Sequence, residues 1–259
     1  MSTTWDAGKK PPSAAVTPWR LLLAVIRALI LAVVVFGGLA VLLVLRLVEW
    51  PLFGQHRPLT PYITQGVCRA AFVILGIGFC SHGQAMGHPG AVVANHSSWL
   101  DIFALNAGKR IYFVSKSEVA GWPGIGWLAR ATGTVFIRRD PKDAQQQKVV
   151  FQNRLLAGHR LLFFPEGTST DGLRVLPFKS TLFAAFFDEK LRCEMYIQPV
   201  TVLYQPPPGQ AAEFYGWWGD MSFHSHLLKT LLTPRQGSVE VIYHIPVQVA
   251  AYRDRKTLA

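Results

Sequence analysis

Cysteine is scarce in this sequence, and the three cysteines present are poorly arranged for cross-links. Cys68, Cys80 and Cys193 form no CxxC pair, and their number is odd. Both features argue against a disulfide framework and against a zinc site, so we expect no metal. The pattern is typical of a domain that faces the cytosol.

Acidic residues are also few. Lysine and arginine outnumber aspartate and glutamate by 26 to 15, which gives the chain a formal net charge of +11. Such an excess favours an anionic partner: a nucleic acid, an anionic membrane or a phosphorylated substrate. The hydrophobic segments of the chain favour the last two.

Charged residues of either sign make up only 16% of the 259 residues, against roughly 25% in an average soluble protein. Residues 28–45, ALILAVVVFGGLAVLLVL, contain no charged or strongly polar side chain. As a helix this run is about 27 Å long, close to the thickness of a bilayer core. A buried core helix is the alternative. A cleaved signal peptide fits poorly, because the run is too long and no small-residue cleavage site follows it.

A second apolar run, AAFVILGIGFC at 70–80, is too short to span a bilayer and predicts a re-entrant, interfacial or core helix. The link between the runs has the prolines and glycine of a turn and the aromatic residues of a membrane interface. We therefore predict a membrane-associating helical pair over 20–80, which crosses the bilayer or dips into it and returns. Residues 1–19 are polar and rich in Pro, Ser and Thr, so we expect a disordered tail.

The remaining residues, 81–259, alternate short aliphatic or β-branched runs with longer segments. This alternation predicts an α/β domain whose sheet is covered by helices on both faces. The predicted strands are 91–94, 111–114, 134–137, 160–164, 196–204 and 238–244. The predicted helices are 98–107, 118–131, 141–157 and 178–188.

Polar residues follow three of the predicted strands. Asn95 and His96 follow the first, Arg138 and Arg139 the third, and Glu166 the fourth. In sheets of this class, functional side chains gather where strands end and loops begin. The three strand ends therefore predict one site.

The spacing of His96 and Asp101 predicts a catalytic pair. If Ser97 or Ser98 caps the following helix, Asp101 lies in its first turn and can fold back onto one imidazole nitrogen. The carboxylate would fix the tautomer and stabilise the imidazolium. The other nitrogen would take the proton of a substrate hydroxyl that attacks an activated acyl carbon, a step worth about 10²–10⁴ in rate. A histidine in an ordinary turn is the alternative.

The segment FFPEGTSTDG at 163–172 predicts a second part of the site. Its glycines and small hydroxyl residues leave backbone amides exposed, and such loops hold phosphates or oxyanions. We expect Glu166 to hydrogen-bond a substrate hydroxyl or to hold the loop. The basic run RRDPKD at 138–143 is either a solvated charge run or an anion site, and its position at a strand end favours the anion site.

Over roughly residues 86–205 the chain resembles the glycerolipid and lysophospholipid acyltransferase family. Four blocks in order carry the resemblance: NHSSWLD (95–101), KSEVAGWPGIGWLARATGTVFIRR (116–139), FPEGTSTDG (164–172) and IQPV (197–200). The first block has the histidine, four residues and aspartate of the family signature. The resemblance implies a mostly parallel sheet flanked by helices, preceded by an N-terminal hydrophobic helix pair.

The resemblance also implies roles for single residues. His96 corresponds to the catalytic base and Asp101 to its orienting partner. The family's acceptor-binding positions in the second and third blocks correspond to Arg138, Glu166, Gly167 and Thr168. The fourth block, with Pro199, has a structural or acyl-binding role.

The activity implied by the resemblance is transfer of an acyl chain from a thioester to the free hydroxyl of a lysolipid, in phospholipid biosynthesis. The thioester of coenzyme A or of an acyl carrier protein is the co-substrate, and no cofactor or metal is expected. The expected partners are the lysolipid acceptor, the acyl donor and the membrane, without nucleic acid or an obligate protein partner. The catalytic domain is expected on the cytosolic face of the membrane.

One position departs from the family pattern. Members that act on lysophosphatidic acid often have an arginine directly after FPEGT, where this chain has Ser169. Lys179 or Arg174 can supply the missing cation. We expect lysophosphatidic acid (1-acylglycerol-3-phosphate) as the acceptor and phosphatidic acid as the product, with a zwitterionic lyso-ornithine lipid as the alternative acceptor.

Three other classes explain the sequence less well. A metallohydrolase with His96, Asp101 and Glu166 as ligands would lack a second well-placed histidine or the cysteines of such sites. A non-enzymatic membrane scaffold explains the hydrophobic segments but not the polar strand ends. Nucleic-acid binding needs aromatic residues interleaved with basic runs. Trp217 and Trp218 are not so placed, and we expect them to be core or interface anchors.

Overall fold

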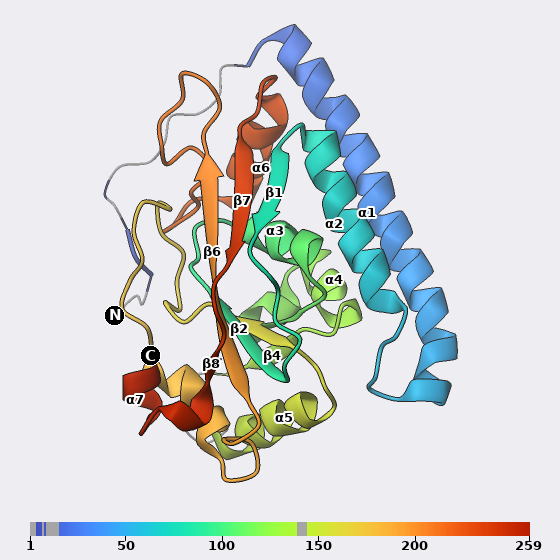
Figure 1. The fold of residues 1–259 in the computed structure, drawn as a ribbon. Coiled ribbons are helices and arrows are strands. Elements are labelled where there is room, and N and C mark those ends of the chain that lie inside the picture. The colour runs from blue at the N-terminus through green and yellow to red at the C-terminus, as the bar shows by residue number, and fades with distance from the viewer. Residues whose placement is uncertain (1–3, 7, 9–15, 139–143) are drawn as a thin grey trace.

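A computed structural model describes the chain except for residues 1–3, 7, 9–15 and 139–143 (Figure 1). Most of the tail expected to be disordered, and Arg139 with the rest of its basic run, lie outside the described residues. The helices are α1 (Pro18–Phe53), α2 (Thr60–Leu75), α3 (Asp101–Gly108), α4 (Ile125–Ala131), α5 (Ala144–Leu156), α6 (Phe223–Leu232) and α7 (Arg255–Leu258). Short 3₁₀ helices include Ser117–Gly121 and Ser180–Phe187.

Among the described residues, eight strands form one sheet: β1 (Gly78–His82), β2 (Gly90–Ala94), β3 (Tyr112–Lys116), β4 (Val135–Ile137), β5 (Leu161–Phe163), β6 (Tyr196–Gln205), β7 (Ser238–Tyr243) and β8 (Val247–Gln248). Their order is β1-β7-β6-β2-β5-β3-β4, with β8 paired to β6. β6 pairs antiparallel with β7 and β8, and the other pairings are parallel. The mostly parallel sheet implied by the family resemblance is confirmed.

The sheet buries apolar side chains on both faces. Along β2, Val92 and Ala94 belong to one hydrophobic cluster, while Ala91 and Val93 belong to another. The first cluster includes residues of α2, α3 and α6, and the second includes residues of α5 and the 3₁₀ helix 180–187. Alternation along a strand sends successive side chains to opposite faces. The central strands are therefore apolar throughout, as expected for a sheet with helices on both sides.

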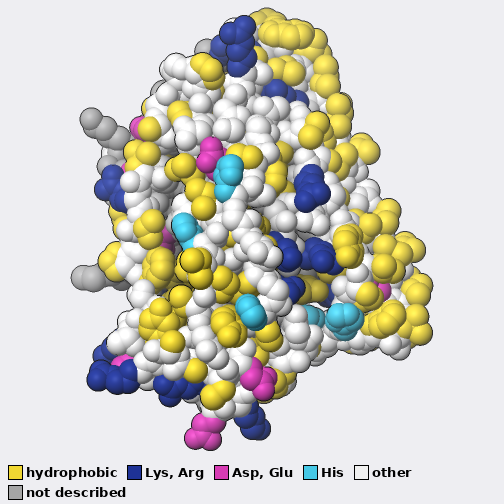
Figure 2. Space-filling view, in the orientation of Figure 1, with side chains coloured by type: hydrophobic (Ala, Val, Ile, Leu, Met, Phe, Trp, Pro, Cys, Tyr) yellow, Lys and Arg dark blue, Asp and Glu magenta, His cyan; other side chains and the backbone are white. Residues whose placement is uncertain are grey.

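The first helix, α1, is 36 residues long, twice the length of the apolar run from which it was predicted. At 1.5 Å per residue it extends about 54 Å, against roughly 30 Å for a bilayer core. Within the described residues it is the helix long and apolar enough to cross a membrane. Apolar side chains line its outer surface at 48–77% exposure, among them Leu29, Val33, Phe36, Val44 and Leu47 (Figure 2). The alternative of a buried core helix is therefore wrong.

Two buried ionic side chains fasten α1 to the rest of the protein. Arg27 donates from Nη1 to the carbonyl oxygens of Leu231 and Thr233, at 3.2 and 2.7 Å, where α6 ends. Glu49 accepts hydrogen bonds from the amide and the hydroxyl of Thr60, at 2.9 and 2.8 Å. Glu49 thereby satisfies amide groups at the start of α2 that have no partner within that helix. Both ends of α1 are thus held by charged groups that are 8% and 1% exposed.

The apolar run 70–80 is a helix only in its first half. Gly76 adopts φ 78°, a left-handed conformation that suits glycine and ends α2. The rest of the run enters β1, which pairs in parallel with β7. The prediction of one helix over 70–80 is therefore wrong, because an apolar run of this length does not distinguish a helix from a buried strand.

The other predicted elements are largely confirmed. All six predicted strands are present. The predicted helix 118–131 is divided into a 3₁₀ helix and α4, and the predicted helix 178–188 is a 3₁₀ helix. The helices α6 and α7 and the strands β1 and β8 were not predicted.

One buried histidine lies in α6. His226 is 2% exposed, and its Nδ1 accepts a hydrogen bond from the indole of Trp99 at 2.9 Å. Burial, and secondarily the charge of Lys229, lower the pKa of His226 to about 3. The fold therefore holds this imidazole in its neutral form.

Candidate active site

His96 lies just beyond the carboxyl end of β2, and Asp101 is the first residue of α3. The imidazole Nδ1 of His96 is 2.8 Å from Oδ2 of Asp101. The aspartate side chain is completely buried, while that of the histidine is 19% exposed. The predicted contact between the two side chains is confirmed.

The helix start differs from the prediction, because neither Ser97 nor Ser98 caps α3 with its side chain. Instead, the carboxylate of Asp101 turns back and accepts hydrogen bonds from the amides of Ser97 and Ser98, at 2.8 and 3.0 Å. The same oxygen, Oδ2, also faces His96. These hydrogen bonds hold the carboxylate in place beside the imidazole.

The second carboxylate oxygen of Asp101 has a partner that the sequence analysis missed. The hydroxyl of Tyr204, near the end of β6, donates to Oδ1 at 2.8 Å. Burial, and then the nearby charge of Asp101, raise the pKa of Tyr204 well above its usual value. The tyrosine therefore stays protonated and remains a hydrogen-bond donor.

These contacts fix the chemistry of the imidazole. Because Asp101 accepts at Nδ1, that nitrogen carries a proton and Nε2 presents its lone pair. The ring of Phe164 stacks on the imidazole with centroids 3.9 Å apart and planes 11° apart. The orientation of His96 is thus set by a carboxylate at one edge and an aromatic ring on one face. Such an imidazole can take a proton at Nε2 while the carboxylate stabilises the resulting cation.

Glu166 joins the histidine segment to the loop that follows β5. Its two carboxylate oxygens accept from the amides of His96 and Leu176, at 2.8 and 2.7 Å, and the residue is 2% exposed. Burial raises the pKa of Glu166, and the two amide hydrogen bonds oppose that rise. Of the two expected roles, these contacts favour holding the loop.

The loop 164–172 also brings Gly167 and Lys179 together. Gly167 adopts φ 74°, and a Cβ built on it would lie 2.6 Å from Nζ of Lys179. Only glycine therefore fits beneath the lysine without a shift. The Lys179 amide donates to the carbonyl of Pro165 at 2.8 Å, and the Thr170 amide donates to the carbonyl of His96 at 2.9 Å. Lys179 is thus placed beside the loop that packs against His96.

Arg174, the other cation considered for this loop, is engaged within it. Its Nε and Nη2 donate to the two oxygens of Asp171, at 3.2 and 2.9 Å. Its guanidinium carbon also lies 5.2 Å from the ring centre of Trp5. The Trp5 amide donates to Oγ1 of Thr168 at 3.3 Å, so Trp5 lies against the loop 164–172.

The remaining predicted residues lie on other strands or loops than the histidine. Arg138 follows β4 and is exposed, and β5 and β3 separate its strand from β2. Pro199 lies in β6 beside Val93 of β2. The predicted anchor Trp218 is 2% exposed and packs against Trp5.

Asn95 is a second residue whose structural task was missed. Its side-chain amide donates to the carbonyl of Val202 at 3.0 Å, and its oxygen accepts from the Val202 amide at 2.8 Å. This pair of bonds ties the end of β2 to β6 next to Tyr204. Alternation along β6 is the signal that could have found the tyrosine, since it faces the same side as the buried Val200 and Val202.

Comparison with known proteins shows the family to which the chain is similar. Residues 79–203 match the family model described as Acyltransferase. A Rhodobacter capsulatus protein named lyso-ornithine lipid O-acyltransferase is 54% identical over 255 residues, covering 98% of this chain and 92% of the relative. A Brucella abortus protein of the same name is 41% identical, covering 67% of this chain and 68% of the relative. A Neisseria gonorrhoeae protein named 1-acyl-sn-glycerol-3-phosphate acyltransferase is 38% identical, covering 46% of this chain and 48% of the relative.

Among solved structures, PlsC from Thermotoga maritima, described as a 1-acyl-sn-glycerophosphate acyltransferase, resembles the chain with a TM-score of 0.64. The identity is 20%, and the match covers 93% of this chain and 90% of that one. At this identity the likeness concerns the fold, which agrees with the expected sheet and helices.

Proposed function

Because the chain belongs to the glycerolipid and lysophospholipid acyltransferase family, we propose that it transfers an acyl chain from a thioester to the free hydroxyl of a lyso-ornithine lipid. The observation that carries the choice of acceptor is the 54% identity to a lyso-ornithine lipid O-acyltransferase over 98% of the chain. Relatives named for 1-acylglycerol-3-phosphate match a smaller share of the chain. The earlier preference for lysophosphatidic acid gains no support from these relatives.

In the proposed reaction His96 is the general base. Its Nε2 removes the proton of the acceptor hydroxyl as the oxygen attacks the thioester carbonyl. A new C–O bond forms, the C–S bond breaks, and the thiol leaves with the proton that the imidazolium returns. Asp101 holds the ring and stabilises the imidazolium, while Tyr204 holds Asp101.

The charge of the acceptor loop supports an acceptor with a single negative group. Lys179 lies against Gly167, whereas Arg174 is paired with Asp171, and Ser169 occupies the position where an arginine is common. A phosphate monoester carries about −1.5 to −2 charges at pH 7, but the carboxylate of an ornithine headgroup carries one. The single charge of one lysine balances that of one carboxylate but only part of the charge of a phosphate monoester. Arg138 is the other proposed contact for this carboxylate.

The proposal includes the acyl donor and the side of the membrane on which the reaction takes place. The thioester of coenzyme A or of an acyl carrier protein supplies the acyl group, and the reaction needs no cofactor or metal at His96. Membrane association follows from the exposed apolar surface of α1 and from the family's lipid substrates. We place the catalytic residues on the cytosolic side, where both kinds of thioester are made.

A panel assay tests the acceptor. Membranes that contain the full chain receive a radiolabelled acyl donor, in turn acyl-coenzyme A and acyl carrier protein, and, separately, lyso-ornithine lipid, lysophosphatidic acid and other lysolipids. Lyso-ornithine lipid is expected to be acylated well above membranes that contain the His96→Ala variant. Acylation of lysophosphatidic acid alone would overturn the choice of acceptor and leave the reaction class intact. If no lysolipid is acylated by either donor, the proposed reaction itself is wrong.

A further inference from the structure

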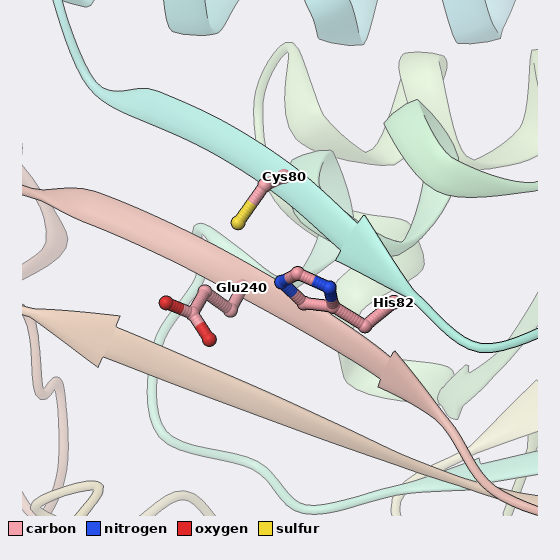
Figure 3. Close-up of side chains that lie close together, drawn as sticks. All are labelled: Cys80, His82 and Glu240. Atoms are coloured by element: carbon pink, nitrogen blue, oxygen red, sulfur yellow. The ribbon is translucent and has the colours of Figure 1, made fainter.

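Three side chains with metal-binding atoms converge at one edge of the sheet, away from His96. Cys80 and His82 project from β1 and Glu240 projects from the neighbouring β7 (Figure 3). One ligand atom from each residue lies within 4.8 Å of the other two. In the sheet order β7 and β6 separate β1 from β2, so this cluster is distinct from the candidate active site.

The pairing of the two strands explains the convergence. Cys80 is directly opposite Glu240 in the parallel register, and His82 is two residues further along β1. Positions two apart on a strand share a face, so all three side chains lie on the same side of the sheet. The alternate positions behave differently: Phe79 packs against the first hydrophobic cluster, and Val239 is completely buried within it. The face that carries the three ligand side chains lies opposite this cluster, and it is half-buried at Cys80 and Glu240 and exposed at His82.

From this geometry we propose that Cys80, His82 and Glu240 bind a zinc ion. Thiolate, imidazole and carboxylate are the ligands that zinc uses, at about 2.3, 2.0 and 2.1 Å. The ligand atoms of a tetrahedral site with these bond lengths lie roughly 3.3–3.8 Å apart. Side-chain rotations that move each ligand atom by about 1 Å therefore close the site around the ion. The thiolate disfavours magnesium and calcium, which prefer oxygen ligands. Three protein ligands leave the fourth position to water.

The other contacts of the three side chains leave them available to a metal. Within the described part of the chain, the side chains of His82 and Glu240 make no hydrogen bond or ion pair. The Cys80 thiol makes one long contact, 3.9 Å from its sulfur to the carbonyl oxygen of Val239. Zinc would therefore displace no strong interaction. The expectation that the protein has no zinc site rested on the missing CxxC pair, whereas here a cysteine and a histidine two apart on a strand supply the ligands.

The bound ion would join the helical pair more firmly to the sheet. β1 is the edge strand, and it follows α2 after a single turn at Gly76. An ion bound by residues of both β1 and β7 would cross-link this edge strand to its neighbour. A metal that binds the folded state alone raises its stability through mass action.

Cobalt titration tests the site on the full chain, purified in detergent and stripped of metal with a chelator. One Co²⁺ per chain is expected, with a sulfur-to-cobalt charge-transfer band in the near ultraviolet that added Zn²⁺ abolishes. Cys80→Ser should lose the band, and His82→Ala should weaken binding at least about tenfold, as even indirect ligand supports change affinity by 10–100-fold. Cys193→Ser is the matched control, because that cysteine is exposed elsewhere in the chain, and it should bind like the wild type.

Two outcomes would overturn the proposal. One is a wild-type chain that shows no charge-transfer band at a stoichiometric amount of Co²⁺. The other is a band that persists in Cys80→Ser or an affinity that His82→Ala does not change. If Cys80→Ser fails to fold, His82→Ala decides the matter, since that side chain is exposed. Thermal denaturation gives a second readout: Zn²⁺ should raise the melting temperature of the wild type and of Cys193→Ser but not of His82→Ala. None of these measurements depends on the acyl acceptor or on the proposed reaction.

Discussion

Replacing Tyr204 by phenylalanine removes one hydroxyl and leaves the ring in place. That hydroxyl donates to Oδ1 of Asp101 at 2.8 Å, and the carboxylate it holds is completely buried. A hydrogen bond to a charged group contributes about 1.5–3 kcal/mol. If this free energy is lost from the transition state, kcat falls roughly 10- to 100-fold, since each 1.36 kcal/mol is tenfold in rate. The acceptor KM should change little, because the hydroxyl contacts the carboxylate and not the lipid.

The pH profile separates a positioning role from loss of packing. With one donor fewer, Asp101 keeps more of its negative charge for the imidazolium of His96. The acid limb of kcat/KM, which reports the free enzyme, should therefore move to higher pH in Tyr204→Phe. The assay is acyl transfer from a radiolabelled thioester to lyso-ornithine lipid, with kcat and KM measured at each pH.

Tyr215 provides the matched control. Its ring centre lies 5.4 Å from that of Tyr204, but its hydroxyl donates to Gln236 at 2.8 Å and has no part in the Asp101 contacts. Tyr215→Phe should keep the wild-type kcat and pH profile. The reasoning fails if Tyr204→Phe has normal kcat and an unshifted acid limb, or if both variants lose activity equally.

Four further outcomes are expected. His96→Ala should lose at least about a hundredfold in acyl transfer while remaining folded by circular dichroism, and near-normal turnover would contradict the mechanism. Ser169→Arg should improve the kcat/KM for lysophosphatidic acid relative to lyso-ornithine lipid, and an unchanged ratio would count against the charge argument. The full chain should stay with membranes in high salt and alkaline carbonate and dissolve in detergent, whereas release by salt alone would exclude insertion of α1. The free energy of unfolding, measured by chemical denaturation, should fall as the pH drops from about 6.5 toward 3. The fold lowers the pKa of His226 to about 3, so in this range the unfolded chain takes up a proton that the folded chain does not. His226→Gln should flatten this dependence, whereas His224→Gln, at an exposed neighbouring position, should not.

The sequence located the catalytic pair because its two members are close along the chain. Only four residues lie between His96 and Asp101, so a strand end and a helix start are enough to bring them together. The partnership of Asp101 with Tyr204 depends on how β6 lies in the sheet relative to α3. Contacts between residues 103 positions apart require the strand order and register, which a single sequence does not supply.

The errors in the helical predictions have local causes. The run 70–80 is uniformly apolar, yet Gly76 ends the helix and the following residues pair with β7. Ser97 and Ser98 have side chains that often cap helices, but here the carboxylate of Asp101 accepts hydrogen bonds from their backbone amides. In both places, a backbone conformation or hydrogen bond decided between two structures that the residue types allow equally.

The fastening of α1 by Arg27 and Glu49 has a mechanical consequence for the whole molecule. These buried groups hold the helix near both ends. A movement of α1 away from the sheet would therefore leave charged groups without their hydrogen-bond partners. Helix α1 and the candidate active site then move as one rigid body. Any tilt of α1 relative to a bilayer becomes an equal tilt of His96 and the loop 164–172. Bilayer thickness and curvature would thus set the depth at which an acceptor hydroxyl meets the base.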